Sequence, residues 1–122
     1  LYVATADVEI YDAATNVWTA AAPMSHGMYD FAVASPDANR ALIFDGYNVE
    51  GTDAGEILLY DGIFNTWSAV GTLVTSRSYP LSNGSNMVTD VGDKDFFLCG
   101  GAHYDALTGV TTLLYTGERF KY

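Results

Sequence analysis

Basic side chains are scarce in this chain of 122 residues: five lysines and arginines stand against 15 aspartates and glutamates, for a formal net charge of −10. Proteins bind the phosphates of nucleic acids and the anionic headgroups of membranes mainly through lysine and arginine. No apolar run approaches the roughly 20 residues that cross a bilayer. These absences argue against nucleic-acid binding and against membrane insertion.

Sulfur and imidazole ligands are also few. Cys99 is the single cysteine, so no disulfide can form within the chain, and we expect its thiol to be buried as a small hydrophobic group. The two histidines, His26 and His103, lack the closely spaced Cys and His partners of a zinc site. We expect both histidines to lie on loops and to make surface hydrogen bonds.

The segment 45–56 begins with Asp and ends with Glu, as the calcium loop of an EF-hand does. Tyr47 and Val49 stand where that loop needs oxygen ligands, so the EF-hand interpretation fails. A different calcium site is an alternative, and it would use the carboxylates of Asp45, Glu50, Asp53 and Glu56. We favour a solvated acidic loop, and predict neither a metal nor a cofactor.

Catalytic motifs are absent as well. The chain has no nucleophile-elbow serine, no phosphate-cradling glycine loop and no HExxH helix. Ser25 and His26 are adjacent, but neighbouring residues in a strand or loop seldom face each other as a catalytic triad requires. We predict no catalytic residue.

A sequence repeat is the most informative feature present. The segments 8–18 (VEIYDAATNVW) and 57–67 (ILLYDGIFNTW) agree at a tyrosine, an aspartate, an asparagine and a tryptophan, in the same order and with the same spacing. Tyr115 follows the second tyrosine after a slightly longer interval and begins a degenerate third copy. Repeats with a period of about 20–50 residues indicate a modular architecture.

A second motif recurs in step with the first. The segment 41–47 (ALIFDGY) matches 96–102 (FFLCGGA), and this match aligns Gly46 with Gly101. In both copies the glycine precedes the next tyrosine of the first motif by the same interval. The extra residues of the later copy therefore fall in the loop 71–85, since insertions belong in loops.

Short runs of β-branched and aromatic residues, separated by Gly, Asn, Asp and Pro, predict strands and turns throughout. No window of helix length shows an apolar period of 3.6 residues. We expect tight hairpin turns at 35–40 and 91–95. We expect strands at 7–11, 17–21, 30–34, 41–45, 56–60, 66–70, 86–90, 95–99 and 111–115.

Four short strands in roughly 50 residues are typical of a β-propeller blade, a four-stranded antiparallel sheet. We predict an all-β fold in one propeller domain with an incomplete ring: the outer two strands of a first blade at 1–22, a complete second blade at 23–70 and most of a third at 71–122. Large aromatic residues fill the space between blades, and glycines allow close backbone approach. The repeat positions to which we assign these structural roles are Tyr11, Trp18, Gly46, Tyr60, Trp67, Gly100, Gly101 and Tyr115.

An apolar strand followed by a glycine pair, then Tyr-Asp, then Trp resembles the kelch repeat over most of the chain. The glycine pair is Gly100-Gly101 in one copy and is weakened to Asp45-Gly46 in the other. Arg77 matches the arginine that precedes the first strand of a kelch blade, whereas the segment 23–30 has no arginine. The resemblance implies a propeller of about 4–8 blades. We therefore expect the remaining blades to come from the same polypeptide or from other chains.

The resemblance also implies a binding scaffold, and sometimes the frame of an enzyme. We predict a non-catalytic segment that binds a protein or a glycan, or that serves in assembly. The loops after the glycine motif and after the Trp strand emerge on one face, and tyrosine and arginine are enriched at interfaces. The candidate binding residues on these loops are His26, Tyr29, Tyr47, Asn48, Arg77, Tyr79, His103 and Tyr104.

Two alternatives stay open. The chain could be part of a secreted kelch-propeller enzyme, such as a copper-radical oxidase of the galactose or glyoxal type, with its catalytic ligands outside this segment. It could equally be an intracellular adaptor module. Asn83 begins an Asn-Gly-Ser triplet that fits the pattern for N-glycosylation, and the chain has only two lysines. Together these two features favour an extracellular or cell-surface location.

Overall fold

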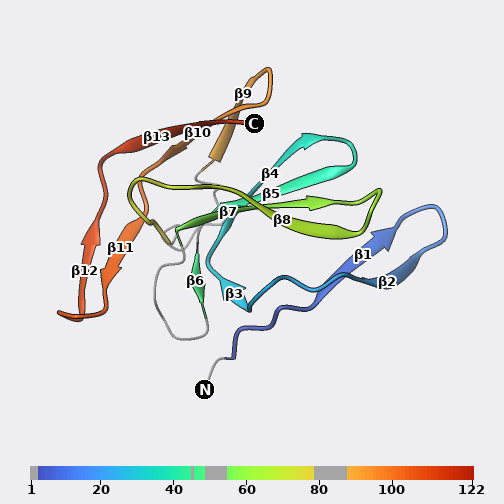
Figure 1. The fold of residues 1–122 in the computed structure, drawn as a ribbon, viewed down its shortest axis with the longest axis horizontal. Helices are drawn as coiled ribbons and strands as arrows, with labels where there is room; N and C mark the ends of the chain where they lie inside the picture. Colours follow the sequence, from blue (N-terminus) through green and yellow to red (C-terminus); the bar gives the residue numbers. More distant parts are fainter. Residues whose placement is uncertain (1–2, 45, 49–54, 79–87) are drawn as a thin grey trace.

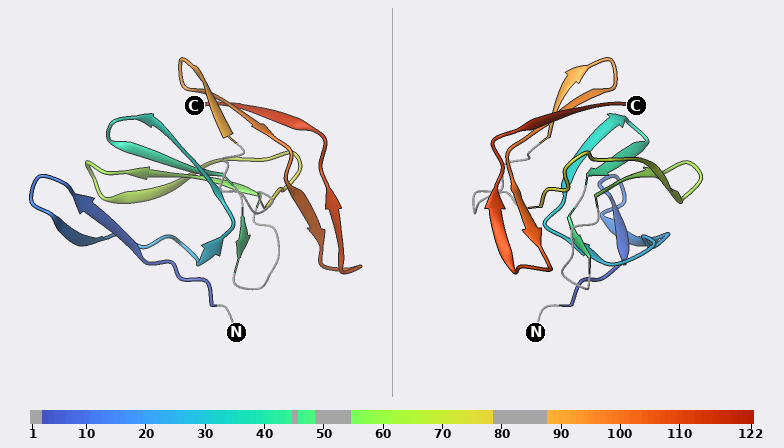
Figure 2. Two further views of the ribbon diagram at one scale, coloured as in Figure 1. Left: turned by 180° about the vertical axis from the view of Figure 1, so that it is seen from behind. Right: turned by 60° about the vertical axis from the view of Figure 1, so that its left-hand side comes forward.

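The computed structural model describes residues 3–44, 46–48, 55–78 and 88–122. The described residues form strands and turns without any helix, and all strand pairs are antiparallel, which confirms the all-β prediction. Among them there is accordingly no helix that could span a membrane. Three main units lie side by side (Figures 1 and 2).

The middle unit is a four-stranded antiparallel sheet in the order β4-β5-β7-β8, which confirms the predicted blade-like sheet. Its strands are β4 (Ala32–Asp37), β5 (Arg40–Phe44), β7 (Glu56–Asp61) and β8 (Thr66–Thr72). Alternate residues of a strand point to opposite faces of its sheet. In β5, Leu42 and Phe44 face one side and Ile43 the other, and all three are buried. Both faces of this sheet are thus covered by its neighbours.

The first unit is a hairpin of β1 (Val8–Asp12) and β2 (Val17–Ala21). The third unit is a three-stranded sheet in the order β13-β10-β9. Its strands are β9 (Val88–Gly92), β10 (Asp95–Cys99) and β13 (Gly117–Lys121). Asp93 and Lys94 join β9 to β10 with positive φ angles of 55° and 57°, the backbone of a tight type I′ hairpin turn.

Two smaller ribbons run beside these sheets, and the sequence did not predict them as separate pairs. The strands β3 (Met28–Tyr29) and β6 (Tyr47–Asn48) pair with each other, as do β11 (Ala102–Asp105) and β12 (Val110–Leu113). Ser78 adds a single bridge to Ala102. Both ribbons contain a strand that begins just after a glycine motif, and they carry the chain away from the end of a main sheet (Figure 1).

The expected strand at 111–115 overlaps β12, but it does not take the third place in the third sheet. β12 ends at Leu113 and pairs with β11, while β13 takes the third place in the sheet. Phe96 pairs with Phe120, as Ala41 pairs with Tyr60 in the middle sheet. Tyr115 lies between β12 and β13 and is 92% exposed. The hairpin β11–β12 delays the third strand, so the equivalent of Tyr60 is Phe120 and not Tyr115.

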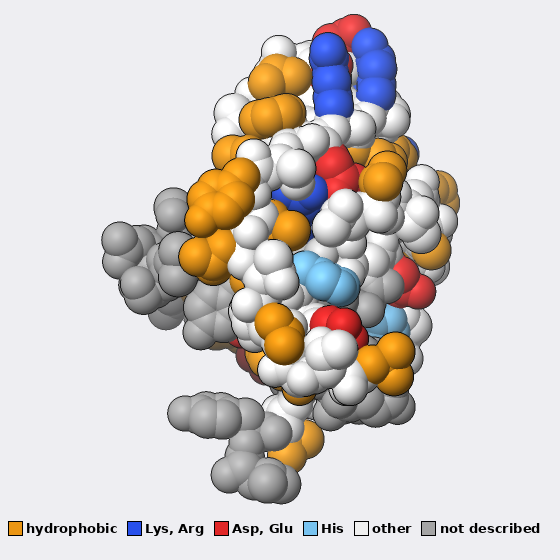
Figure 3. All heavy atoms as spheres, turned by 90° about the vertical axis from the view of Figure 1, so that its left-hand side faces the viewer, with side chains coloured by type: hydrophobic (Ala, Val, Ile, Leu, Met, Phe, Trp, Pro, Cys, Tyr) orange, Lys and Arg blue, Asp and Glu red, His pale blue; other side chains and the backbone are white. Residues whose placement is uncertain are grey.

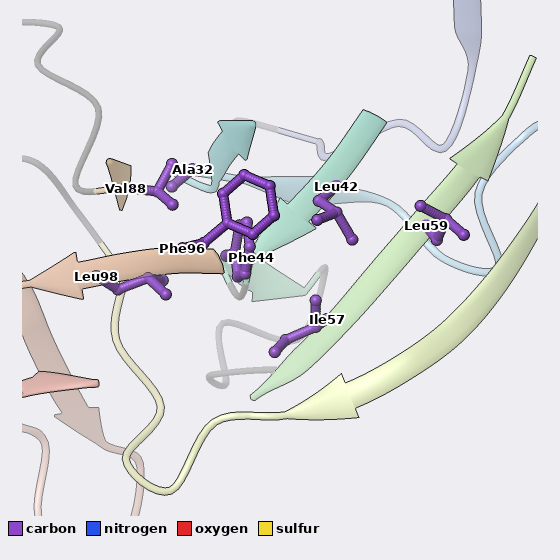
Figure 4. Close-up of a cluster of buried hydrophobic side chains, with 8 residues drawn as sticks. All are labelled: Ala32, Leu42, Phe44, Ile57, Leu59, Val88, Phe96 and Leu98. Carbon is purple, nitrogen blue, oxygen red and sulfur yellow. The ribbon is translucent and has the colours of Figure 1, made fainter. Parts of the chain in front are cut away.

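The main core lies between the middle and third sheets (Figure 4). The Phe44 ring packs with its centroid 5.9 Å from that of Phe96 and 5.8 Å, edge to face, from that of Phe120. The whole buried cluster consists of Ala32, Leu42, Phe44, Ile57, Leu59, Val88, Phe96 and Leu98. A second cluster joins the first unit to the middle sheet and contains Met24, Met28, Ile43 and Leu58.

The prediction of a buried Cys99 is also wrong, because the thiol is exposed. Phe96 and Leu98 of β10 are buried against the middle sheet, and the intervening Phe97 is 41% exposed. Cys99 shares the face of Phe97 by the alternation of the strand. The division of the chain at residues 22 and 70 into three blades stays a prediction.

Candidate protein-binding surface

The repeated Tyr-Asp…Asn…Trp motif forms the same structure twice. Tyr11 and Trp18 are cross-strand partners with ring centroids 5.1 Å apart, and Tyr60 and Trp67 repeat this at 5.0 Å. Each tyrosine hydroxyl donates to the side-chain oxygen of the motif's asparagine, at 2.7 Å in the first copy and 2.8 Å in the second. The two asparagines have positive φ angles of 57° and 53°, a conformation that asparagine tolerates well.

The second copy also fastens the first unit to the middle sheet. Asn65 Oδ1 accepts a hydrogen bond from the Ala22 backbone N–H at 2.7 Å. Trp67 Nε1–H donates to the Ala22 carbonyl oxygen at 2.8 Å. Both polar groups of one peptide residue are thereby satisfied by two side chains that lie far along the sequence. We call this pair of hydrogen bonds the Asn–Trp clamp.

Glycine is required at one of the repeat positions. Gly46 has a φ angle of 123°, and an added Cβ there would lie 2.8 Å from the backbone oxygen of Tyr29. Gly100 and Gly101 at the matching turn also have positive φ angles, of 71° and 90°. Both turns use backbone conformations that other residues rarely adopt.

Arg77, a candidate binding residue, is buried and serves the interior. Its side chain is 0% exposed and pairs with Glu118 at 2.6 Å. The guanidinium also donates to the carbonyl oxygens of Gly100 and Thr116, at 3.1 and 2.9 Å. The interpretation of Arg77 as a contact residue is therefore wrong. Glu118 on β13 accepts a hydrogen bond from the Arg77 guanidinium. No local sequence pattern indicates that Arg77 has an ion-pair partner so far along the chain.

Glu118 is held by several donors besides Arg77. Its two carboxylate oxygens accept from the backbone N–H groups of Val74 and Thr75, at 2.7 and 3.0 Å. Burial by itself would raise the pKa of Glu118, but these two hydrogen bonds and Arg77 together lower the pKa below its usual value. The carboxylate is thus kept ionised, and it ties the segment after β8 to β13.

The middle sheet places an apolar pair where the third sheet has this ion pair. In the middle unit Tyr29 pairs with Tyr47, and the equivalent bridge of the third unit joins Ser78 to Ala102. Met28, the residue before Tyr29, is therefore equivalent to Arg77, the residue before Ser78. Ile43 and Leu98 are equivalent positions of the two units, and their strand partners are Leu58 and Glu118. Leu58 is therefore equivalent to Glu118. Met28 and Leu58 lie in one buried cluster. The repeat therefore accommodates either chemistry at this site.

Three of the candidate binding residues are brought together in a row. The Tyr29 and Tyr47 rings, from β3 and β6, have centroids 5.4 Å apart. Tyr104, from β11, lies with its ring centroid 6.3 Å from that of Tyr47. Tyr29 is 42% exposed, and the other two are partly exposed. We call these three residues the tyrosine row, and it joins segments from two successive repeat units.

The histidines flank this region and bond to neighbouring serines. His26 Nδ1 lies 2.9 Å from Ser25 Oγ, and its Nε2 lies 3.9 Å from a Glu56 carboxylate oxygen. His103 lies in the strand β11, so the expectation that it lies on a loop is wrong, and its Nδ1 lies 3.1 Å from Ser76 Oγ. Asn48 pairs in β6 with Met28.

The remaining site predictions fall partly on other segments. Tyr79, Asn83 and three of the four proposed calcium carboxylates (Asp45, Glu50 and Asp53) lie outside the described residues. Within the described ranges, no group of three or more His, Cys, Asp or Glu side chains could hold a metal ion.

Comparison with known proteins agrees with this architecture, although no family model matches the chain. The chain is 28% identical over 112 residues to Kelch-like protein 25 of Xenopus tropicalis, an alignment that covers 90% of this chain and 19% of that protein. It is 32% identical over 75 residues to an F-box/kelch-repeat protein of Arabidopsis thaliana, covering 62% of this chain and 20% of that protein. The chain is related to kelch-repeat proteins. It spans about a fifth of the length of these curated relatives.

The basic groups of this chain are largely neutralised within it. Arg40 pairs with Asp37 and Asp61, Arg119 with Asp95, and Lys121 with Asp93. Figure 3 shows blue cationic side chains at one end of a face and again between that end and the pale-blue histidine side chains, with red carboxylate side chains beside them in both places.

Proposed function

We propose that this kelch-repeat chain is a non-catalytic part of a protein-interaction scaffold, and that its partner binds across the tyrosine row. The observation that carries the proposal is that Tyr29, Tyr47 and Tyr104 come from separate strands of two ribbons and still form one contiguous set of rings. Tyrosine offers a large contact area at low entropic cost, together with a polar tip.

The charge of the chain indicates which partners suit it. The formal net charge is −10, and the described ion pairs already occupy most of its basic side chains. A strongly acidic partner would meet repulsion, whereas a basic or neutral partner surface would not. A basic partner could also place a lysine or arginine over a tyrosine ring.

A photo-crosslinking experiment tests the proposal. The benzoylphenylalanine group would replace Tyr29 in the protein expressed in its native host, and covalent adducts would be identified by mass spectrometry. Val91, 55% exposed on the β9–β10 hairpin, provides the matched control position. We expect discrete protein adducts at position 29 and none at position 91. Equal labelling at both positions, or none at position 29, would contradict the proposal.

The finer alternatives have their own tests. A glycan partner would stack sugar faces on the same tyrosines, and a glycan array probed with the wild-type protein and with Tyr29→Ala would detect it. Stoichiometric copper in the intact protein would overturn the non-catalytic assignment in favour of an oxidase. We also propose an extracellular or cell-surface location, and a mass loss at Asn83 on glycosidase treatment tests it.

A further inference from the structure

The strand β12 has an open edge. It pairs with β11 on one side, and among the described residues no strand pairs with its other side. All four of its residues are exposed. The Leu114 N–H donates to the Gly101 carbonyl oxygen at 2.9 Å and so extends the ladder with β11. Because peptide groups alternate in direction along an antiparallel ladder, Thr111 and Leu113 point their N–H and C=O groups away from β11.

A continuation of the repeat would not cover this edge. In the middle unit, the segment that follows β8 reaches Gly55, whose carbonyl oxygen accepts from the Leu73 N–H. The next residue, Val74, already binds Glu118 of the third sheet. By the register that aligns the two sheets, the counterpart of Gly55 is Tyr115. A fourth strand beside β13 would therefore leave the sheet before it reached β12.

The edge of β12 also lacks the usual protection. Edge strands avoid pairing with other chains through charged residues, prolines or bulges. The pairing of β8, the outer strand of the middle sheet, contains such a bulge. The register of β12 with β11 is continuous, and the run from Ala106 to Gly117 has no charged residue and no proline. Val110 and Leu113 are 54% and 49% exposed. This edge is therefore suited to receive a further strand.

The charge of the chain indicates which strand that is. Two copies with a net charge of −10 repel each other wherever their carboxylates meet. Asp105 and Glu118 border the uncharged run, and Glu118 is paired with Arg77 at 2.6 Å. A second copy would thus meet little like charge along β12, and a basic partner strand would find no carboxylate there. We propose that two copies of the chain pair through β12, antiparallel and about a two-fold axis.

The ladder with β11 sets the register of this pair. Hydrogen bonds between the copies must join groups that point outward, so Thr111 pairs with Leu113 of the second copy and Leu113 with its Thr111. Thr112, the middle of the segment 110–114 that pairs with β11, then faces Thr112 of the second copy. Cross-strand threonine pairs are favourable. A shift towards the hairpin turn would bring Gly109, with its φ of 70°, into the ladder.

Cysteine cross-linking of the whole chain tests the register. Cys99→Ser removes the natural thiol, and Thr112→Cys introduces one at the two-fold axis. Directly opposed residues lie within the range that a disulfide spans, so we expect a disulfide-linked dimer in a glutathione redox buffer. Thr111→Cys, which faces Leu113 across the pair, and Thr19→Cys, which is exposed on β2, are the matched controls. Both should link several-fold more slowly. Linking at either control position as fast as at Thr112 would contradict the proposed pair.

Sedimentation of the chain without new cysteines measures the association. We expect a monomer–dimer equilibrium that Thr112→Lys weakens by about tenfold or more, because two lysines would then face each other. The added lysine lowers the net negative charge, so general repulsion cannot explain such a loss. Thr112→Val keeps a β-branched residue and should change the dissociation constant by less than about twofold. Far-UV circular dichroism verifies that both variants fold.

Amide hydrogen exchange provides an independent measurement. The Thr111 and Leu113 N–H groups should exchange more slowly as the protein concentration rises, whereas the Thr112 N–H, which points to β11, should not change. The proposal is overturned if the chain stays monomeric, if Thr112→Lys associates as strongly as the wild type, or if exchange at Thr111 and Leu113 is independent of concentration. The pair uses none of the three rings of the tyrosine row, so the inference does not depend on the proposed partner site.

Discussion

The buried pair of Arg77 and Glu118 allows a sharp test of how the repeat is held together. The middle sheet contains Met28 and Leu58 at the equivalent positions. We predict that the double change Arg77→Met with Glu118→Leu, which copies that apolar pair, is far less damaging than either change alone. The repeat supplies the replacement side chains and the backbone in which they already pack.

The magnitudes follow from burial and from hydrogen bonding. The Arg77 side chain is 0% exposed and that of Glu118 is 15% exposed, so removing either partner leaves a largely desolvated charge. Breaking such a pair costs about 3–5 kcal/mol. The double variant removes both charges, but the carbonyls of Gly100 and Thr116 lose donors. The backbone N–H groups of Val74 and Thr75 also lose the Glu118 carboxylate as their acceptor. The double variant should therefore lower the free energy of unfolding by about 1–3 kcal/mol.

Urea unfolding followed by tryptophan fluorescence measures these free energies, since Trp67 is partly buried between the first unit and the middle sheet. We expect a double-mutant coupling of about 3 kcal/mol or more, which marks two residues acting as one unit. Additive losses would refute the reasoning, because the two side chains would then be independent. Single losses under about 1 kcal/mol would refute it equally, because the pair would then resemble an exposed ion pair.

Three further predictions use the same unfolding assay. Gly46→Ala should lower the free energy of unfolding by about 3 kcal/mol, because a φ of 123° is strained for alanine and the added Cβ would collide with backbone atoms. Gly109→Ala should lower it by about 1 kcal/mol, because its φ is 70° and no atom lies close to the added Cβ. Equal losses for the two variants would contradict this reasoning. Asn65→Ala should lose about 2 kcal/mol, since Oδ1 accepts from two donors, and Asn16→Ala less than about 1 kcal/mol, since its one hydrogen bond is exposed. The pKa of Glu118 in the folded protein lies below its ordinary value. Its contribution to the stability of the fold should therefore be complete above about pH 4.3, and it should be lost as the pH falls through the folded pKa. In the Glu118→Gln variant, the Tm should fall less steeply with decreasing pH in this acidic range.

Short strands bounded by turn residues could be predicted from the sequence. The expected strands at 17–21 and 95–99 have the bounds of β2 and β10. The reason is local: short runs rich in β-branched and aromatic residues favour the strand, and the flanking Gly, Asn and Asp residues end it. The matched motifs also predicted correctly that the middle sheet has four antiparallel strands.

The errors arose where a residue's role depends on a distant partner. Tyr115 kept the spacing of the repeat, but Phe120 holds the position beside β10 because sheet pairing, not spacing, sets the register. Cys99 was misplaced because three apolar residues precede it in β10, and only the structure shows that Phe96 and Leu98, and not Phe97, face the core. For Arg77 the resemblance marked a repeat position, but it did not show that the side chain is buried, because loop arginines are usually exposed and its partner Glu118 lies far along the chain.

Both the sequence and the tertiary structure were needed to identify the tyrosine row. The sequence marked Tyr29, Tyr47 and Tyr104 as candidates because they were expected on loops and tyrosine is amphipathic. The structure places them instead in the strands β3, β6 and β11, and these ribbons bring their rings within contact. The β3–β6 ribbon could not be predicted from the sequence, because two-residue strands carry no periodicity, and the pairing of β11 with β12 was not predicted either.

By itself the sequence determined the repeat, the all-β class and the resemblance to kelch repeats, because strand propensity, turn chemistry and motif spacing are local properties. Tertiary structure alone decided which charges are buried, which copy of the motif is occupied and which strand completes the third sheet. Each of these depends on the free energy of contacts between segments that are distant in the sequence: Asn65 and Trp67 bind Ala22, and Arg77 is buried because Glu118 meets it.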